Sequence, residues 1–214
     1  MPLAANAVLG DITGDTNRRC KTDSNPSSTV VTCFDFGLTK EGRLNGCAAD
    51  AQCISSSAVQ NPSKFSPPWS PSDVSPEAKD IPRAWRALVS AIEDQEGLQI
   101  VERRDEDKYL RATAVSEVPK EGVDDVEFRL LEETPPLALF RSATRQSLYV
   151  YPLQQPVPNQ KSHADRLQQI RTRLGWEELG LAGDAALERD MAGAQVRNVF
   201  GLNFGGVKIP EEYE

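Results

Sequence analysis

Residues 123–145 constrain the fold more than any other part of the chain. They contain two runs of alternating side chains, 125–132 and 137–144, separated by Pro135-Pro136. Alternation with a period of two is typical of β-strands, and a short proline-containing link joins neighbouring strands that run in opposite directions. This stretch therefore predicts two adjacent strands of an antiparallel sheet, with carboxylates opening the first and arginines closing the second.

Two more strands and two helices complete the predicted domain. The strands are expected near 98–103 and over 109–115, and short links again favour antiparallel neighbours. The first helix follows an Asp80 N-cap and buries one stripe of side chains at helical spacing: Ile81, Ala84, Trp85, Leu88, Val89 and Ile92. The second follows a capping-box pattern at 162–165. The sequence thus predicts an α+β fold, a four-stranded antiparallel sheet with helices on one face.

Composition divides the chain into four regions. Residues 1–60 are predicted to form a cysteine-containing N-terminal extension, and 61–80 a Pro/Ser-rich connector that runs extended over a surface. Residues 81–179 are the predicted α+β core domain, in which 146–161 form a long loop. Residues 180–214 are predicted to form a C-terminal helix and an apolar arm.

The predicted arm carries apolar side chains interrupted by glycine: Val199, Phe200, Leu202 and Phe204. Because it lies beyond the second helix, it cannot easily bury these side chains alone, and a large exposed apolar patch marks an interaction site. The arm therefore either folds back on the core or docks on another protein. In the second case these four residues bind the partner.

Four cysteines lie in the first quarter of the chain: Cys20, Cys33, Cys47 and Cys53. They form no Cys-x-x-Cys pair and the chain has one histidine, so we predict no metal site and no cofactor. An even number of cysteines in a Gly/Asn/Ser-rich segment predicts two disulfides, as in exported proteins. Local pairing favours Cys20–Cys33 and Cys47–Cys53, although four cysteines allow three connectivities. The alternative is a cytosolic protein with four free thiols.

The net charge of −8 argues against nucleic acid and anionic membranes as partners, because both attract basic proteins. No run approaches the roughly 18 apolar residues of a membrane span, so we expect a peripheral protein. The sequence Ala5-Asn6-Ala7 has the small-x-small form of a signal-peptidase site. It favours an exported protein, with an ordinary alanine-rich chain end as the alternative.

Two predicted strand faces each end in one charged residue. Asp124 shares its face with apolar side chains of the first strand, and Arg141 shares its face with Leu137 and Leu139. If the two meet at one end of the core, they form an ion pair that fixes the register, because an unpaired buried charge is very costly. The alternative is a small polar pocket that holds an anion or a partner carboxylate, with these ligand-binding residues: Asp124, Arg141, Ser142 and Arg145.

The sequence predicts no catalytic residue. Asp124 and Asp125 cannot act together as acid and base on one substrate, because adjacent residues of a strand point to opposite faces. No Gly-x-Ser-x-Gly motif surrounds Ser142. His163 lies near a helix N-terminus, where a cation is disfavoured, and is expected to be a surface residue. We therefore expect that the protein is not an enzyme.

Four short motifs, taken together and in order, carry a family resemblance: Cys47 to Ser57, Asp124 to Phe128, Arg141 to Arg145 and Arg166 to Arg171. Over residues 47–175 the chain resembles the domain-of-unknown-function family number 1499, in its plastid (thylakoid-lumen) branch. Two features depart from the family pattern. Residues 146–161 replace a shorter link, and Ala164-Asp165 stands where the family has Asn-Arg.

The resemblance implies a plastid relative of a bacterial exported protein, and it supplies no reaction. We expect a non-catalytic accessory protein of the chloroplast thylakoid lumen. It would bind a photosynthetic membrane complex, photosystem II first among them, for assembly, repair or stabilisation. Long extensions on a small core favour docking over catalysis. The alternative is a small anion- or ligand-binding module or enzyme that uses the Asp124/Arg141/Arg145 end of the sheet.

Overall fold

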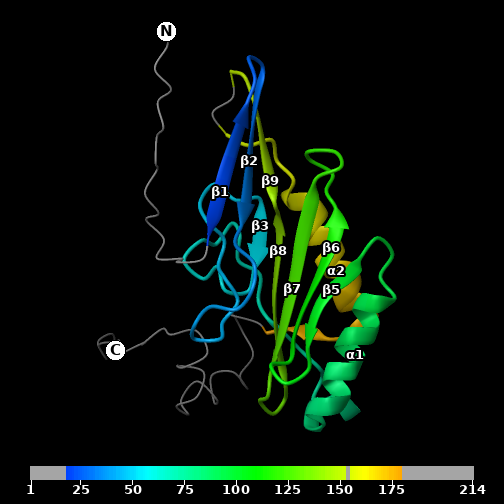
Figure 1. The fold of residues 1–214 in the computed structure, drawn as a ribbon. Helices are drawn as coiled ribbons and strands as arrows, with labels where there is room; N and C mark the ends of the chain where they lie inside the picture. The colour runs from blue at the N-terminus through cyan, green and yellow to red at the C-terminus, as the bar shows by residue number, and fades with distance from the viewer. Residues whose placement is uncertain (1–17, 153–154, 180–214) are drawn as a thin grey trace, which may run out of the picture.

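The computed structural model describes residues 18–152 and 155–179, which form a mixed α+β fold with two antiparallel sheets (Figure 1). The larger sheet has seven strands in the order β10-β4-β8-β7-β6-β5, with β3 also paired to β8. Its strands are β3 (Cys53–Ser55), β4 (Trp69–Ser70), β5 (Gln99–Arg104), β6 (Tyr109–Val115), β7 (Val123–Leu131), β8 (Leu137–Thr144) and β10 (Glu177–Glu178).

The predicted antiparallel run is confirmed as β5, β6, β7 and β8, each within two residues of its expected bounds. The predicted size of the sheet was wrong, because the sheet has seven strands rather than four. The additional strands β3, β4 and β10 contain two or three residues each. A segment that short shows no alternation, so its partner strand in the folded protein decides its conformation.

A second sheet of three strands, in the order β1-β2-β9, extends beyond one end of the first (Figure 1). It is built from β1 (Arg19–Ser24), β2 (Ser28–Phe34) and β9 (Gln146–Val150). Strand β9 corrects the expectation of a long loop over 146–161. Only Arg145 separates β8 from β9, so one run of chain passes from the larger sheet into the smaller one.

Two α-helices flank the four central strands in sequence, α1 (Ile81–Glu93) and α2 (Gln160–Leu174), and a 3₁₀ turn, η1 (Pro76–Lys79), precedes α1. The Asp80 N-cap is confirmed, because its carboxylate accepts a 2.9 Å hydrogen bond from the Arg83 amide. The predicted start of α2 was wrong. The helix begins at Gln160 after Asn159, so the pattern at 162–165 lies inside it.

The main core lies between the two helices and one face of the larger sheet, which confirms that both helices cover the same face (Figure 1). Its buried side chains include Trp69, Trp85, Leu88, Ile92, Phe128, Phe140, Leu167, Ile170 and Trp176. Trp69 belongs to the Pro/Ser-rich connector and is 1 % exposed, so the connector is anchored in this core. Burying such a side chain contributes about 1.5–3 kcal/mol.

The opposite face of the sheet is covered by the chain that follows β2. A smaller apolar cluster forms there from Leu44, Tyr109, Leu137 and Leu139. Strand β8 consequently has apolar or polar partners on both faces, and all eight of its residues are buried. Four charged residues of β7 and β8 are consequently buried: Asp124, Asp125, Glu127 and Arg141.

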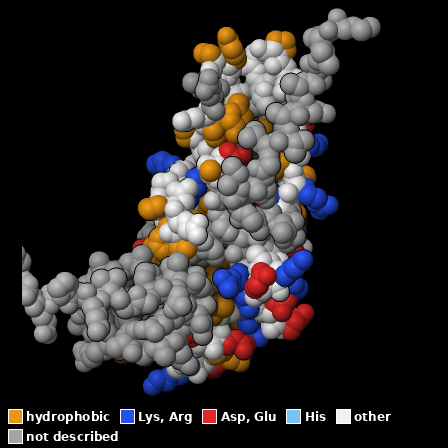
Figure 2. Space-filling model, turned by 90° about the vertical axis from the view of Figure 1, so that its left-hand side faces the viewer, with side chains coloured by type: hydrophobic (Ala, Val, Ile, Leu, Met, Phe, Trp, Pro, Cys, Tyr) orange, Lys and Arg blue, Asp and Glu red, His pale blue; other side chains and the backbone are white. Residues whose placement is uncertain are grey.

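The surface of the described residues carries charges of both signs. Figure 2 shows Lys, Arg, Asp and Glu side chains gathered at the lower end of the molecule, with apolar side chains at the upper end. No helix in the described ranges is long and apolar enough to cross a membrane. The expected C-terminal helix and the arm residues Val199, Phe200, Leu202 and Phe204 lie outside the described residues.

Candidate functional site

Asp124 and Arg141 lie on opposite faces of the larger sheet, so the predicted ion pair between them was wrong. The register of β7 and β8 sets Asp124 opposite Thr144 and Glu127 opposite Arg141. Side chains alternate along each strand. Asp124 therefore points toward the helices, as Phe128 and its neighbours in the core do, and Arg141 points toward the chain that covers the other face.

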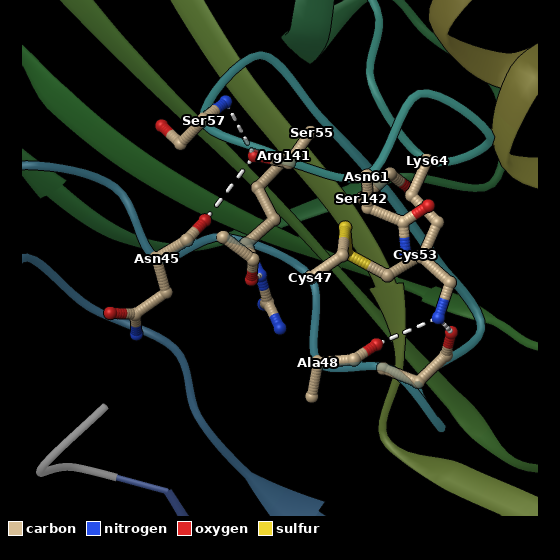
Figure 3. The surroundings of a disulfide bond; sticks show 12 residues. Asn45, Cys47, Ala48, Cys53, Ser55, Ser57, Asn61, Lys64, Arg141 and Ser142 are labelled. Carbon is tan, nitrogen blue, oxygen red and sulfur yellow. Dashed lines mark hydrogen bonds between the residues drawn. A yellow bond between two sulfur atoms is a disulfide. The ribbon is translucent and has the colours of Figure 1, made fainter. Parts of the chain in front are cut away.

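Arg141 lies at the centre of a buried cluster on the face away from the helices, the Arg141 cluster, which consists of Asp35, Tyr109, Glu127 and Arg141. The Arg141 side chain is 0 % exposed and lies 3.1 Å from the Glu127 carboxylate and 2.7 Å from that of Asp35. Its Nε donates a 3.2 Å hydrogen bond to the Gly46 carbonyl. In Figure 3 the guanidinium lies near Asn45 and the Cys47–Cys53 disulfide. One cation thus joins three separate parts of the chain.

Glu127 receives two further hydrogen bonds within this cluster. The Tyr109 hydroxyl donates to it at 2.9 Å, and the Gly37 amide donates at 2.7 Å. Burial, with the charge of Glu127 as the next cause, raises the pKa of Tyr109 far above its usual value, so the phenol stays protonated as a donor. The carboxylate is therefore held by three donors in the protein interior, which is what a buried charge requires.

On the helix-covered face lies the His163 cluster, which consists of Asp124, Ser142, Thr144, Asn159, His163 and Arg166. The Ser142 hydroxyl lies 2.8 Å from His163 Nδ1, and the Thr144 hydroxyl lies 2.9 Å from Nε2. The imidazole is 0 % exposed, so the expectation of a surface histidine was wrong. In the first turn of α2 this residue faces the sheet rather than the solvent.

The hydrogen bonds of Thr144 indicate which nitrogen of His163 carries the proton. Thr144 donates to Asp124 at 2.9 Å and accepts from the Asn159 amide at 2.8 Å. Its oxygen can then accept from Nε2–H, which leaves Nδ1 to accept from the Ser142 hydroxyl. Burial lowers the pKa of His163 to about 4, in agreement with a neutral ring.

The contact between Ser142 and His163 has the residue types of a nucleophile and its base, yet its setting does not suit catalysis. Ser142 is 0 % exposed, so its hydroxyl offers no approach for a substrate carbonyl. The Asp124 carboxylate lies 3.9 Å from Nδ1, the nitrogen that faces Ser142, instead of orienting the ring from the other side. Asp124 is paired with Arg166 at 2.9 Å. The cluster is therefore a closed polar network that joins α2 to the sheet.

A third group, the Asp125 cluster, consists of Phe36, Arg111, Asp125 and Arg145. Arg145 binds Asp125 with two nitrogens, at 2.9 Å and 2.6 Å, and Arg111 binds the same carboxylate at 3.1 Å. The Phe36 ring lies 4.0 Å from the Arg111 guanidinium and 5.3 Å from that of Arg145. Both guanidinium groups therefore share the Asp125 carboxylate and the Phe36 ring.

Both predicted disulfides, Cys20–Cys33 and Cys47–Cys53, are confirmed, and no described cysteine is free. The second bridge closes a short loop, and the Lys64 side chain binds the backbone of this loop (Figure 3). The Lys64 ammonium donates to the carbonyls of this loop at 2.6–2.7 Å: Ala48, Ala49 and Ala51. Burial lowers the pKa of Lys64, and nearby Asp50 acts against this effect.

Of the four residues predicted to bind a ligand, the structure brings together only Asp124 and Ser142, in the His163 cluster. Arg141 and Arg145 each belong to a different cluster. Sequence reasoning missed Asp35, which no periodic pattern marks. Over residues 18–152 and 155–179, no group of three or more His, Cys, Asp or Glu side chains is placed to hold a metal ion.

Residues 43–174 match the family model described as "Protein of unknown function (DUF1499)". The chain belongs to this family. No curated protein matches the chain. The matched residues include β7, β8 and α2, so all three clusters lie largely within the DUF1499 region. Asp35 and Phe36 precede that region and complete two of the clusters from outside it.

Proposed function

We propose that this DUF1499 protein is a non-catalytic accessory protein that acts by binding another protein. The observation that carries the proposal is that the charged residues of the candidate site are neutralised within the chain. Asp124 pairs with Arg166, Arg141 with Glu127, and Arg145 with Asp125. A charged group that is already paired inside the chain must give up its partner before it can bind a substrate, and breaking such a buried pair is costly.

The disulfides support the compartment that we propose. All four cysteines are paired, whereas the cytosolic alternative expects four free thiols. Disulfides persist in oxidising compartments and are rare in the cytosol. Together with the resemblance to the plastid branch of the family, this pairing supports the chloroplast thylakoid lumen as the location.

The partner that we propose is a photosynthetic membrane complex, with photosystem II as the first candidate, and the role is assembly, repair or stabilisation. The protein would act at the lumenal face without entering the bilayer. The apolar segment at residues 199–204 is the proposed docking element. An apolar segment of that kind gains most when its side chains enter a complementary surface of a partner.

The anion-binding alternative has less support. Arg141 would have to give up Glu127 and Asp35 before it could bind an external anion, and its side chain is 0 % exposed. Arg145 would likewise have to release a two-point contact with Asp125. Each exchange trades a buried charge-assisted contact for a similar one and yields little net affinity.

A pull-down from detergent-solubilised thylakoids tests the proposal with the full chain as bait. The test variant is Phe200→Ser/Phe204→Ser, which removes two apolar side chains from the proposed docking element. The matched control is Val74→Ser/Val115→Ser, because these side chains are 93 % and 72 % exposed in other parts of the chain.

Capture of photosystem II subunits by the wild-type chain and the control, with loss in the test variant, is the expected result. Equal capture by all three chains would move the docking surface away from the 199–204 segment. Capture of no membrane complex by any of them would refute the proposed role, and calorimetric titration with phosphate and citrate would then test the anion-binding alternative.

A further inference from the structure

The two disulfides differ in how accessible they are to another protein. Cys20 is an exposed residue of β1, an edge strand of the small sheet, and all six residues of that strand are exposed. In the other bridge Cys53 is 0 % exposed and Cys47 is half-buried. Thiol–disulfide exchange requires that a thiolate reach one sulfur directly, so it is favoured at Cys20.

Arg18 distinguishes the two sulfurs of the accessible bridge. Its Nη2 donates a 3.3 Å hydrogen bond to the sulfur of Cys33, which is 9 % exposed. The guanidinium is held in place by the Asp50 carboxylate at 2.9 Å. A neighbouring cation stabilises a thiolate and lowers its pKa, and a thiol of lower pKa is the better leaving group.

We propose that the Cys20–Cys33 disulfide is a thiol–disulfide exchange site for a dithiol protein, with Cys20 as the sulfur attacked and Cys33 as the leaving group. Cys20 offers the open approach, and Arg18 stabilises the negative charge that develops on Cys33. Arg18 is thus a positioning residue for this exchange, because it acts through the leaving group, Cys33.

The exchange balances without any further reagent. A thiolate of the dithiol protein attacks the Cys20 sulfur, the Cys20–Cys33 bond breaks, and its electron pair goes to the Cys33 sulfur. The second thiol of the partner, as its thiolate, then attacks the partner sulfur of the mixed disulfide and releases Cys20. The partner is oxidised from a dithiol to a disulfide, and Cys20 and Cys33 are reduced to two thiols that carry the two protons.

Reduction also has a structural consequence in the small sheet. Within that sheet β1 pairs only with β2, and none of its side chains is buried. Once the bridge opens, the backbone hydrogen bonds between Arg19–Ser24 and Ser28–Phe34 are what remains to hold the strand. Because β1 is an edge strand without a buried side chain, few other contacts oppose its opening, so the amides of residues 19–24 should exchange faster with solvent after reduction.

The oxidised full chain would be treated with dithiothreitol under native conditions, quenched with iodoacetamide and analysed by mass spectrometry. Cys20–Cys33 is expected to open first, with Cys47–Cys53 still closed. A thioredoxin-type protein whose second active-site cysteine is replaced by serine should become trapped on Cys20. Opening of Cys47–Cys53 at the same rate, or trapping on Cys33, would overturn the assignment.

Arg18→Gln is expected to slow the reduction of Cys20–Cys33 about three- to tenfold, because Cys33 becomes a poorer leaving group. Arg19→Gln is the matched control, since it removes the same charge from the next residue, which is exposed. Equal rates for the two variants would show that Arg18 has no part in the exchange. The trapping result on the wild-type chain does not depend on either variant.

Discussion

The carboxylate of Glu127 and the guanidinium of Arg141 lie 3.1 Å apart across neighbouring strands, and neither side chain is exposed to solvent. Glu127 is the residue of the larger sheet whose carboxylate pairs with Arg141. A second carboxylate, Asp35, reaches the same guanidinium from the covering chain. The pair therefore fixes the register of β7 and β8 and at the same time ties the N-terminal segment to the sheet.

Replacement of Arg141 by methionine is expected to lower the free energy of unfolding by about 3–5 kcal/mol, because it leaves a buried carboxylate without its cation. Urea denaturation with both disulfides intact measures the change. Arg103→Met is the control, because that side chain is 39 % exposed and its ion pair with Asp105 should contribute about 0–1 kcal/mol. Equal losses for the two variants would mean that the Arg141 cluster is not a stabilising element.

The β7–β8 hairpin could be predicted because both strands are long and joined by a short link, whereas β9 could not. Strand β9 takes its partner from β2, far away in the sequence, so no local pattern marks it. The same holds for β3 and β4, which are ordered by pairing with β8. Local periodicity describes an element alone, and these strands exist only through their partners.

The site was harder to predict than the fold because β8 is buried on both faces. Its apolar residues do not reveal which face meets the helices, so the period-two rule assigned Arg141 to the same side as Asp124. The register Phe128↔Phe140 shows the reverse. For His163 the error came from the helix start, since α2 begins at Gln160 and turns the ring inward.

His163 is expected to titrate well below the ordinary histidine pKa of about 6.5, because burial lowers its pKa to about 4. It is the chain's single histidine, so one imidazole signal in an NMR titration identifies it without assignment. The signal should stay in its neutral position as the pH falls through 6. A midpoint at 6.5 or above would contradict the buried neutral ring.

The same pKa sets a dependence of stability on pH. Between about pH 6.5 and 4 the unfolded chain binds a proton on His163 that the folded chain does not, so the free energy of unfolding falls as the pH decreases. The slope from this group is about 1.4 kcal/mol per pH unit in that window, and it vanishes above it. In His163→Gln the profile should lack this component.

Lys64→Met is expected to destabilise the protein by about 1–3 kcal/mol, because it withdraws a charged donor from the carbonyls inside the Cys47–Cys53 loop. Thermal unfolding of the oxidised protein measures the loss. Lys79→Met serves as the control, since Lys79 is exposed at the end of η1. If both substitutions lower the melting temperature equally, the Lys64 contacts do not stabilise the loop.

Trp69→Ala is expected to lower the free energy of unfolding by about 3–5 kcal/mol. The indole is 1 % exposed, and its ring centre lies 4.3 Å from that of Phe140, so truncation opens a cavity where the connector enters the core. Val74→Ala changes an apolar residue of the same connector that is 93 % exposed, and its effect should stay within about 0.5 kcal/mol. A loss below about 1 kcal/mol for Trp69→Ala would mean that the connector does not depend on this anchor.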